Sequence, residues 1–257
     1  MIGFDCSQNG VVKYNAMGDW LLASSFPENV FKLRNEKVID VYKSWVFDYN
    51  PYVVRDVKAE RIIDIMPAWV EYARDSPVIY SFSDSLLTMF LDYQGHPLLR
   101  HPRLYRYEDL EMIPDRIVLH TEGGRNKPTP RLMDEQVINF ILDKYKNYDI
   151  IQVGGKNDRI IEGTKNCLGA DIWESVKIIS QCAMFIGVDS GPLHIAQAYP
   201  RINKKMIVTK AQFDRDWPEH YWPMNPKDHF SFWYDWDINY FNEFDRDVGI
   251  TTSYKSI

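Results

Sequence analysis

The densest group of chemically useful residues lies between positions 184 and 196 of the 257-residue chain. Met184–Val188 is an apolar run with the length of a buried strand. It is followed by Asp189, Ser190, Gly191, Pro192 and His194. Asp189 or Ser190 can cap a helix, so this stretch predicts a strand, a tight turn and a helix start. A helix start attracts anions, which makes the turn a candidate phosphate site to which His194 adds a donor. The alternative is that the two residues only cap the helix and that His194 is a buried polar residue.

Two other loops follow predicted strands in the second half of the chain. The run 116–120 leads into the flexible loop 121–127, and the run 149–153 leads into the glycine turn 154–158. In an open parallel sheet such loops leave from the carboxyl edge, where ligands bind. Together they would supply cations, close backbone approach and a carboxylate for ribose hydroxyls, which suits a nucleoside diphosphate. The candidate binding residues are Thr121, Arg125, Lys127, Gly154, Gly155, Asp158, Asp189, Ser190, Gly191 and His194.

Other cofactor classes lack their sequence signals. The chain has no G-x-G-x-x-G fingerprint and no G-x-x-x-x-G-K-[ST] loop, which disfavours nicotinamide-cofactor and ATPase functions. Acidic residues two apart occur near the C-terminus, including Asp235 and Asp237, but this D-x-D pattern is common by chance. We therefore expect no metal and no cofactor, with a metal-dependent transferase that uses Asp235 and Asp237 as the alternative.

The order of apolar segments predicts an α/β protein. Predicted strands at 38–42, 62–66 and 78–82 alternate with helical segments, and a second alternation begins at residue 116, which favours parallel sheets with crossover helices. The segment 94–115 is rich in Arg, His and Pro and reads as a connection. We divide the chain into domains 1–113 and 114–257, the second ending in an aromatic-rich tail.

Composition limits the possible partners. The formal net charge of −6 argues against a large nucleic-acid footprint, although the Arg- and His-rich segment 94–106 keeps a local one open. Three cysteines without a CxxC pair indicate a reducing, cytoplasmic setting. No apolar run is long enough to span a bilayer, and the N-terminus lacks a signal-peptide pattern. Oligomeric state is not predicted.

The motifs resemble those of glycosyltransferase family nine, the ADP-heptose:lipopolysaccharide heptosyltransferases. The most specific match is the D-S-G-P-x-H-x-A turn at 189–196. A strand leading into the paired glycines Gly154 and Gly155 agrees in order and spacing, as does an N-terminal Gly-Asp pair, Gly18 and Asp19. The similarity is strongest from 116 to 209 and extends to 18–56.

This resemblance implies a GT-B fold, with two Rossmann-like domains facing across a cleft and the donor nucleotide in the C-terminal one. It implies metal-independent transfer of a sugar with inversion, Asp19 acting as general base and Gly18 joining the donor-binding residues. The N-terminal domain is short for the family, and the loop 121–127 lacks the family's Lys/Arg-Trp arrangement. The acceptor, a glycan or another hydroxyl, and the cation that meets the diphosphate therefore stay open.

We accordingly expect a glycosyltransferase that uses a nucleotide-diphosphate sugar. The first alternative is an epimerase or hydrolase of nucleotide sugars on the same fold, which would convert the donor without an acceptor. The second is an inactive nucleotide-binding module, in which Asp19 would be replaceable.

Overall fold

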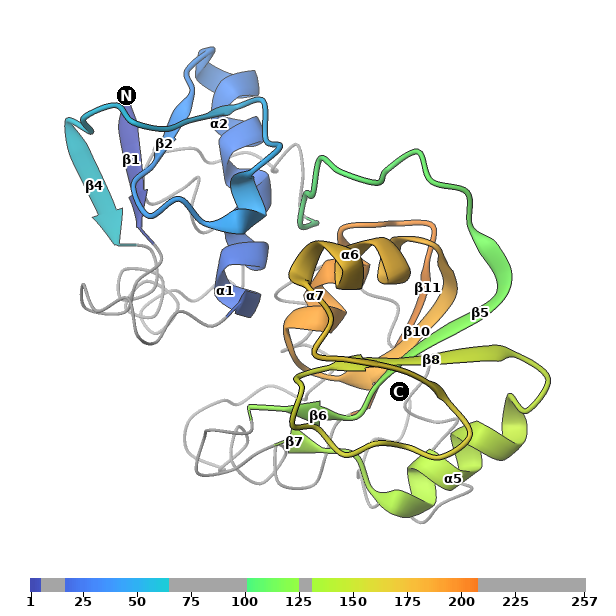
Figure 1. Ribbon diagram of the computed structural model, residues 1–257. Coiled ribbons are helices and arrows are strands. Elements are labelled where there is room, and N and C mark those ends of the chain that lie inside the picture. Colours follow the sequence, from blue (N-terminus) through green and yellow to red (C-terminus); the bar gives the residue numbers. More distant parts are fainter. Residues whose placement is uncertain (6–16, 65–100, 125–130, 208–257) are drawn as a thin grey trace, which may run out of the picture. The chain divides into compact units, whose positions relative to one another are not determined.

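The computed structural model describes residues 1–5, 17–64, 101–124 and 131–207 (Figure 1). The chain divides into two compact units, and among these residues the first ends at Arg106 and the second begins at Tyr107. Each unit contains its own parallel sheet with accompanying helices. The expected α/β class with two parallel-sheet domains is confirmed.

Unit 1 contains a four-stranded parallel sheet in the order β3-β2-β1-β4. Its strands are β1 (Ile2–Asp5), β2 (Val38–Asp40), β3 (Val53–Val54) and β4 (Arg61–Asp64). Its helices are α1 (Met17–Leu22), η3 (Ala23–Ser25), α2 (Phe26–Arg34) and η4 (Trp45–Phe47). Leu21, Phe26 and Ile39 are fully buried and anchor these helices in the core of the unit. The N-terminal residues of α1 are thereby held on a packed element.

Unit 2 is built on a five-stranded parallel sheet in the order β11-β10-β5-β8-β9, with a separate two-stranded hairpin β6-β7. The strands of the sheet are β5 (Ile113–His120), β8 (Asp149–Gly154), β9 (Lys165–Leu168), β10 (Cys182–Val188) and β11 (Asn203–Ile207). The hairpin pairs β6 (Glu122–Gly123) with β7 (Arg131–Leu132) in antiparallel register. The helices are α5 (Glu135–Lys144), α6 (Ile172–Ser180) and α7 (Gly191–Gln197).

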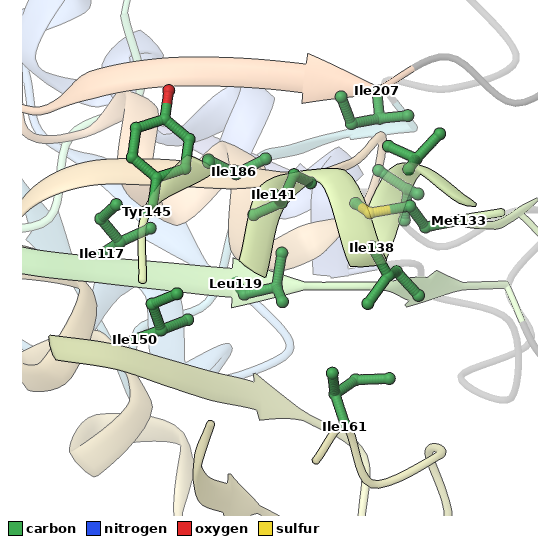
Figure 2. Close-up of a cluster of buried hydrophobic side chains, with 12 residues drawn as sticks. Ile117, Leu119, Met133, Ile138, Ile141, Tyr145, Ile150, Ile161, Ile186 and Ile207 are labelled. Carbon is green, nitrogen blue, oxygen red and sulfur yellow. The ribbon is translucent and has the colours of Figure 1, made fainter. Parts of the chain in front are cut away.

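Helices cover both faces of this sheet. Figure 1 shows α5 on one side, with α6 and α7 on the other. Asp134 caps α5 by accepting a hydrogen bond from the Gln136 N–H at 2.8 Å, and the apolar stripe of the helix then faces the strands. Figure 2 shows the resulting cluster. Its members are Ile117, Leu119, Met133, Val137, Ile138, Ile141, Tyr145, Ile150, Ile161, Ile186, Val188 and Ile207.

Burial of this cluster fixes the strands whose ends carry the candidate site. Removing a side chain such as Ile138 or Ile141 from water contributes about 1.5–3 kcal/mol. Side chains alternate along a strand, so Ile117 and Leu119 point into the cluster while His120 points to the other face of β5. The core therefore sets the direction of the polar residues at the strand ends.

Some local predictions were wrong. The loop 121–127 was expected to be flexible throughout, but Glu122 and Gly123 form β6 because they pair with Leu132 and Arg131. The connection expected at 94–115 is shorter, because β5 already begins at Ile113. The predicted strand 78–82 and the C-terminal tail lie outside the described residues.

Candidate functional site

The three candidate loops of unit 2 leave from the same edge of the sheet. The strands β10, β5 and β8 are neighbours and run parallel, and they end at Val188, His120 and Gly154. Thr121, the Gly154–Asp158 turn and the Asp189–His194 turn therefore follow adjacent strand ends. The carboxyl edge of a parallel sheet is the usual place for a ligand in such folds.

The carboxylate of Asp189 contacts two other side chains at this edge. Its Oδ2 accepts a short charge-assisted hydrogen bond from the Nη1 of Arg131, and its Oδ1 lies 3.6 Å from the Nε2 of His194. The side chains of Asp189, Arg131 and His194 are 4%, 14% and 5% exposed. The three form one buried cluster in which the carboxylate lies between a cation and an imidazole.

The β6-β7 hairpin brings Arg131 to this place. Gly123 pairs with Arg131 in the hairpin, and β6 packs against β10. A Cβ atom added to Gly123 would lie 3.2 Å from the carbonyl oxygen of Asp189 and 3.2 Å from the Cβ of Ser190. Glycine therefore permits the close approach that delivers the guanidinium to the end of β10.

His194 is neutral at physiological pH in this environment. Burial lowers its pKa to about 4; the negative charge of Asp189 opposes this shift, and the positive charge of Arg131 adds to it. A neutral imidazole can donate one hydrogen bond but carries no charge. The expected contribution of His194 to phosphate binding is thus that of a donor and not that of a cation.

A second buried histidine, His120, is the last residue of β5. His120 is buried at the end of β5, and its Nδ1 lies 3.0 Å from the carbonyl oxygen of Val153, which can only accept. Burial lowers the pKa of His120, although the hydrogen bond to Val153 opposes the change. His120 therefore links the ends of β5 and β8 as a neutral group.

The glycine turn after β8 is closed by its own carboxylate. Asp158 accepts a hydrogen bond from the Gly155 N–H at 2.8 Å, and its backbone N–H donates to the Gly155 carbonyl at 3.0 Å. Gly154 has a φ of +156°, and a Cβ atom there would lie 2.3 Å from Asp158 Oδ2. Alanine at this position would have a strained φ and would require Asp158 to move, and the turn holds one oxygen of the Asp158 carboxylate against the backbone.

Buried polar side chains hold the loop beyond this turn. Gln152 donates from Nε2 to the Arg159 carbonyl at 2.7 Å and accepts from the Ile161 N–H at 2.9 Å. Glu122 accepts from the Arg159 N–H at 2.9 Å. Residues 155–164 are consequently tied to both β8 and β6 before any ligand arrives.

Thr121 offers an unused hydrogen-bonding group. It is 2% exposed, and its Oγ1 has no hydrogen-bond partner among the residues that the structure describes. Its backbone carbonyl accepts from the Met133 N–H at 2.8 Å, which anchors the residue at the root of the hairpin. A buried hydroxyl without a partner is uncommon in proteins and is explained most simply by a ligand, ion or water that completes it.

The helix start after β10 differs from the prediction. Ser190 takes the N-cap position of α7, but its hydroxyl makes no capping hydrogen bond and donates to the Val188 carbonyl at 3.1 Å. Asp189 turns toward Arg131 instead. Gly191 and Pro192 form the first turn of α7, as expected.

The remaining predicted residues are placed only in part. Gly18 and Asp19 lie in the first turn of α1 in unit 1, where the Asp19 side chain is not described. Arg125 and Lys127 lie outside the described residues. Thr121, Gly154, Gly155, Asp158, Asp189, Ser190, Gly191 and His194 all lie in unit 2 at the carboxyl edge.

Arg131 and Glu122 lie at this edge of the sheet but are not among the residues predicted from the sequence. The sequence places Arg131 58 residues before Asp189, and only the two-residue strands of the hairpin join them. His120 was treated as the last residue of a strand, although a histidine that ends an apolar strand run was a usable signal. Within the described ranges no group of three His, Cys, Asp or Glu could hold a metal ion.

Comparisons with known proteins rest on structure. No protein-family model matches the sequence, and neither does any curated protein. The chain is similar to the iron-containing glycosyltransferase TibC of enterotoxigenic E. coli, with a TM-score of 0.55 and 16% identity over 80% of this chain and 56% of TibC. It is similar to a family 9 glycosyltransferase of Veillonella parvula, with a TM-score of 0.57 and 11% identity over 83% of this chain and 87% of that one.

The E. coli heptosyltransferase WaaC, in a structure with ADP, gives a TM-score of 0.56 and 10% identity over 82% of this chain and 91% of WaaC. The fold is that of the GT-B heptosyltransferases. The expected fold class is confirmed, and the resemblance to these enzymes is confirmed in fold. The chain spans little more than half the length of TibC. No described helix has the length and apolar character needed to cross a membrane.

Proposed function

We propose that the protein is a glycosyltransferase that moves a sugar from a nucleotide-diphosphate donor to an acceptor hydroxyl. The observation that carries this proposal is the convergence of Thr121, the Gly154–Asp158 turn and the Asp189–His194 turn at one carboxyl edge of a heptosyltransferase-like sheet. TibC and WaaC, which share the fold, have been crystallised with ADP-D-β-D-heptose and with ADP. An ADP-linked sugar is therefore the first donor to test.

In the proposed complex the diphosphate is bound by hydrogen-bond donors and cations of the loops after β5 and β10. Thr121 Oγ1 is buried without a partner in the described part of the chain, and it would donate to a phosphate oxygen. Gly154 and Gly155 form the turn that holds Asp158, and this carboxylate would accept from a ribose hydroxyl. Arg125 or Lys127 would balance the negative charge that develops on the leaving diphosphate.

The transfer step is proposed to be inverting and metal-independent. Asp19 removes the proton from the acceptor hydroxyl as that oxygen attacks the anomeric carbon, and the bond from this carbon to the diphosphate oxygen breaks on the opposite side. The nucleoside diphosphate leaves with the electron pair of that bond. Gly18 and Asp19 belong to unit 1, so domain 1–113 would act on the acceptor and domain 114–257 on the donor.

A thermal-shift panel tests donor binding. ADP, UDP, GDP, CDP and their common sugar conjugates are added in the presence of EDTA, and a ligand that binds only the folded protein raises the midpoint. We expect a shift with one nucleotide class, ADP first. No shift with any nucleotide, with or without added divalent ions, would overturn the proposal.

Turnover then separates a transferase from the alternative functions. Release of nucleoside diphosphate that requires an acceptor supports transfer, whereas conversion of the donor alone supports an epimerase or hydrolase. Asp19→Asn should reduce transfer by at least about a hundredfold while nucleotide binding is retained. Unchanged turnover in this variant would show that Asp19 is not the base.

A further inference from the structure

One charged residue at the carboxyl edge is not explained by donor contacts. Arg131 is 14% exposed, and its guanidinium is bonded to Asp189. The Nη1 of Arg131 donates to the carboxylate of Asp189, the first residue of the Asp189–His194 turn, and its Nε is buried without a partner in the described part of the chain. The contact that the structure shows for Arg131 is thus made to the turn, through Asp189.

We propose that Arg131 is a positioning residue of the donor site, whose guanidinium fixes the Asp189 carboxylate and, through it, the imidazole of His194. This inference rests on the proposed function, because the turn that Arg131 orders is the one assigned to the donor diphosphate. It adds a residue that lies outside the D-S-G-P-x-H-x-A turn itself.

The geometry gives Asp189 two different neighbours. One oxygen accepts from Arg131, and the other lies 3.6 Å from His194 Nε2. Rotation of the carboxylate toward solvent would break the ion pair in a buried setting, where an unpaired charge is costly. The ion pair therefore holds the carboxylate in the orientation that faces His194.

The same pair sets the charge of the site. With Arg131 present, the charge of Asp189 is balanced and burial keeps His194 neutral, with a pKa of about 4. Without Arg131, the unbalanced carboxylate would stabilise a protonated imidazole and raise the pKa of His194. The elements packed against α7 also carry Glu174 and Lys177 on α6 and Lys204 and Lys205 on β11, so the variant is compared with the wild type under one set of conditions.

Nuclear magnetic resonance titration of His194 measures this coupling without any ligand. The His194 signal is assigned by its loss in His194→Asn, and its pKa is measured in wild type, Arg131→Gln, Arg131→Lys and the double variant Arg131→Gln/Asp189→Asn. We expect the pKa to rise by at least one unit in Arg131→Gln and to return toward the wild-type value in the double variant, where neither charge remains. Arg131→Lys keeps the charge, so the pKa of His194 in this variant should lie between its values in wild type and in Arg131→Gln.

Nucleotide binding provides the second readout. The affinity for ADP should vary little between pH 5 and pH 7.5 in wild type, whereas in Arg131→Gln it should fall at least fivefold at pH 7.5 and depend on pH in this range. The matched control is Arg116→Gln, which removes an arginine ion pair at the other end of the same sheet. It should leave both the His194 titration and the ADP affinity unchanged.

The outcomes separate the two proposals. An unmoved His194 pKa in folded Arg131→Gln, with ADP still bound as tightly as by wild type, overturns the role of Arg131 alone. A wild type that binds no nucleotide overturns the proposed function and with it the role of Arg131 toward a donor. If Arg131→Gln does not fold, Arg131→Lys decides. A His194 pKa and an ADP affinity that both equal those of wild type would then contradict the inference.

Discussion

The two edges of the five-stranded sheet carry similar charges in different surroundings. At the amino edge, Asp149 lies between Arg116, at 3.4 Å, and Lys165, at 2.5 Å, and the Lys165 side chain is 70% exposed. At the carboxyl edge, Asp189 pairs with Arg131, and the side chains of the pair are 4% and 14% exposed. Solvent screens the exposed Lys165, so its ion pair with Asp149 contributes little to stability.

The second group cannot be rearranged without leaving a charge unpaired. The hydrogen bond from Lys165 lowers the pKa of Asp149, whereas burial lowers the pKa of His194 to about 4. Water thus solvates the Lys165 cation at the amino edge, while Asp189 and His194 at the carboxyl edge are almost fully enclosed. This difference supports the assignment of the carboxyl edge as the binding site.

The largest predicted difference in stability is between variants that neutralise Asp189 and Asp149, one at each edge of the sheet. Asp189→Asn leaves Arg131 buried without its counter-charge, and we expect a loss of about 3–5 kcal/mol in the free energy of unfolding. Asp149→Asn at the amino edge should cost about 1 kcal/mol or less. Urea unfolding followed by circular dichroism measures both, and equal losses would show that the two edges do not differ in this way.

Acid should destabilise the carboxyl edge through His194. Its pKa is about 4 in the folded protein and 6.5 in the unfolded chain, so the unfolded state binds the proton first as the pH falls. The stabilising contribution is complete above pH 6.5 and is lost progressively toward pH 4, in total about 3 kcal/mol. His194→Gln lacks this titration, so its free energy of unfolding should fall about 2–3 kcal/mol less than that of wild type between pH 7 and pH 4.5. Parallel pH profiles for the two proteins would contradict the buried neutral histidine.

An intermediate loss of stability is expected for an alanine substitution in the glycine turn, with a second glycine of positive φ as the control. Gly154→Ala combines a positive φ with a Cβ only 2.3 Å from Asp158 Oδ2, and we expect a cost of about 2–3 kcal/mol. Gly163→Ala has a φ of +86° but open space around the added carbon, so it should cost about 1 kcal/mol. Thermal unfolding of the two variants makes the comparison. A larger loss for Gly163→Ala would mean that the turn at Gly154 is not closed as described.

The smallest effect is expected at the exposed end of the amino edge. Lys165→Gln removes a largely solvated cation, and we expect about 0.5 kcal/mol, which should vanish in 1 M salt because screening removes the interaction. Denaturant unfolding at low and high salt tests this. A salt-independent loss of 2 kcal/mol or more would place Asp149 in a buried pair like that of Asp189.

Much of this fold is predictable from the sequence because apolar runs and periodic apolar stripes indicate its strands and helices. The run 184–188 lies within β10, and the apolar stripe of α5 packs on the sheet as its spacing requires. The parallel arrangement follows from the alternation of strands and helices, and it brings the loops after β5, β8 and β10 to one edge.

Only those parts of the candidate site that are continuous in the sequence could be predicted from it. The two-residue strands of the β6-β7 hairpin are too short for any periodic signal, so the delivery of Arg131 to Asp189 was not foreseen. Asp189 was expected to cap α7 or bind a ligand, because local sequence cannot show that a distant guanidinium competes for its carboxylate. When a distant residue binds a side chain, as Arg131 binds Asp189, the local sequence no longer predicts which contacts that side chain makes.

The most direct test of the account uses the buried hydroxyl of Thr121. Calorimetric titration of ADP is performed on wild type, Thr121→Val and the control Ser180→Ala, which removes a buried hydroxyl bonded to the Lys177 carbonyl on α6. We predict that Thr121→Val weakens ADP binding at least tenfold while the free energy of unfolding is unchanged or slightly raised, because the hydroxyl has no partner in the described part of the chain. Ser180→Ala should bind ADP as wild type does. Equal ADP affinity in wild type and Thr121→Val, or no binding of any nucleoside diphosphate by either, would contradict a donor site at this edge of the sheet.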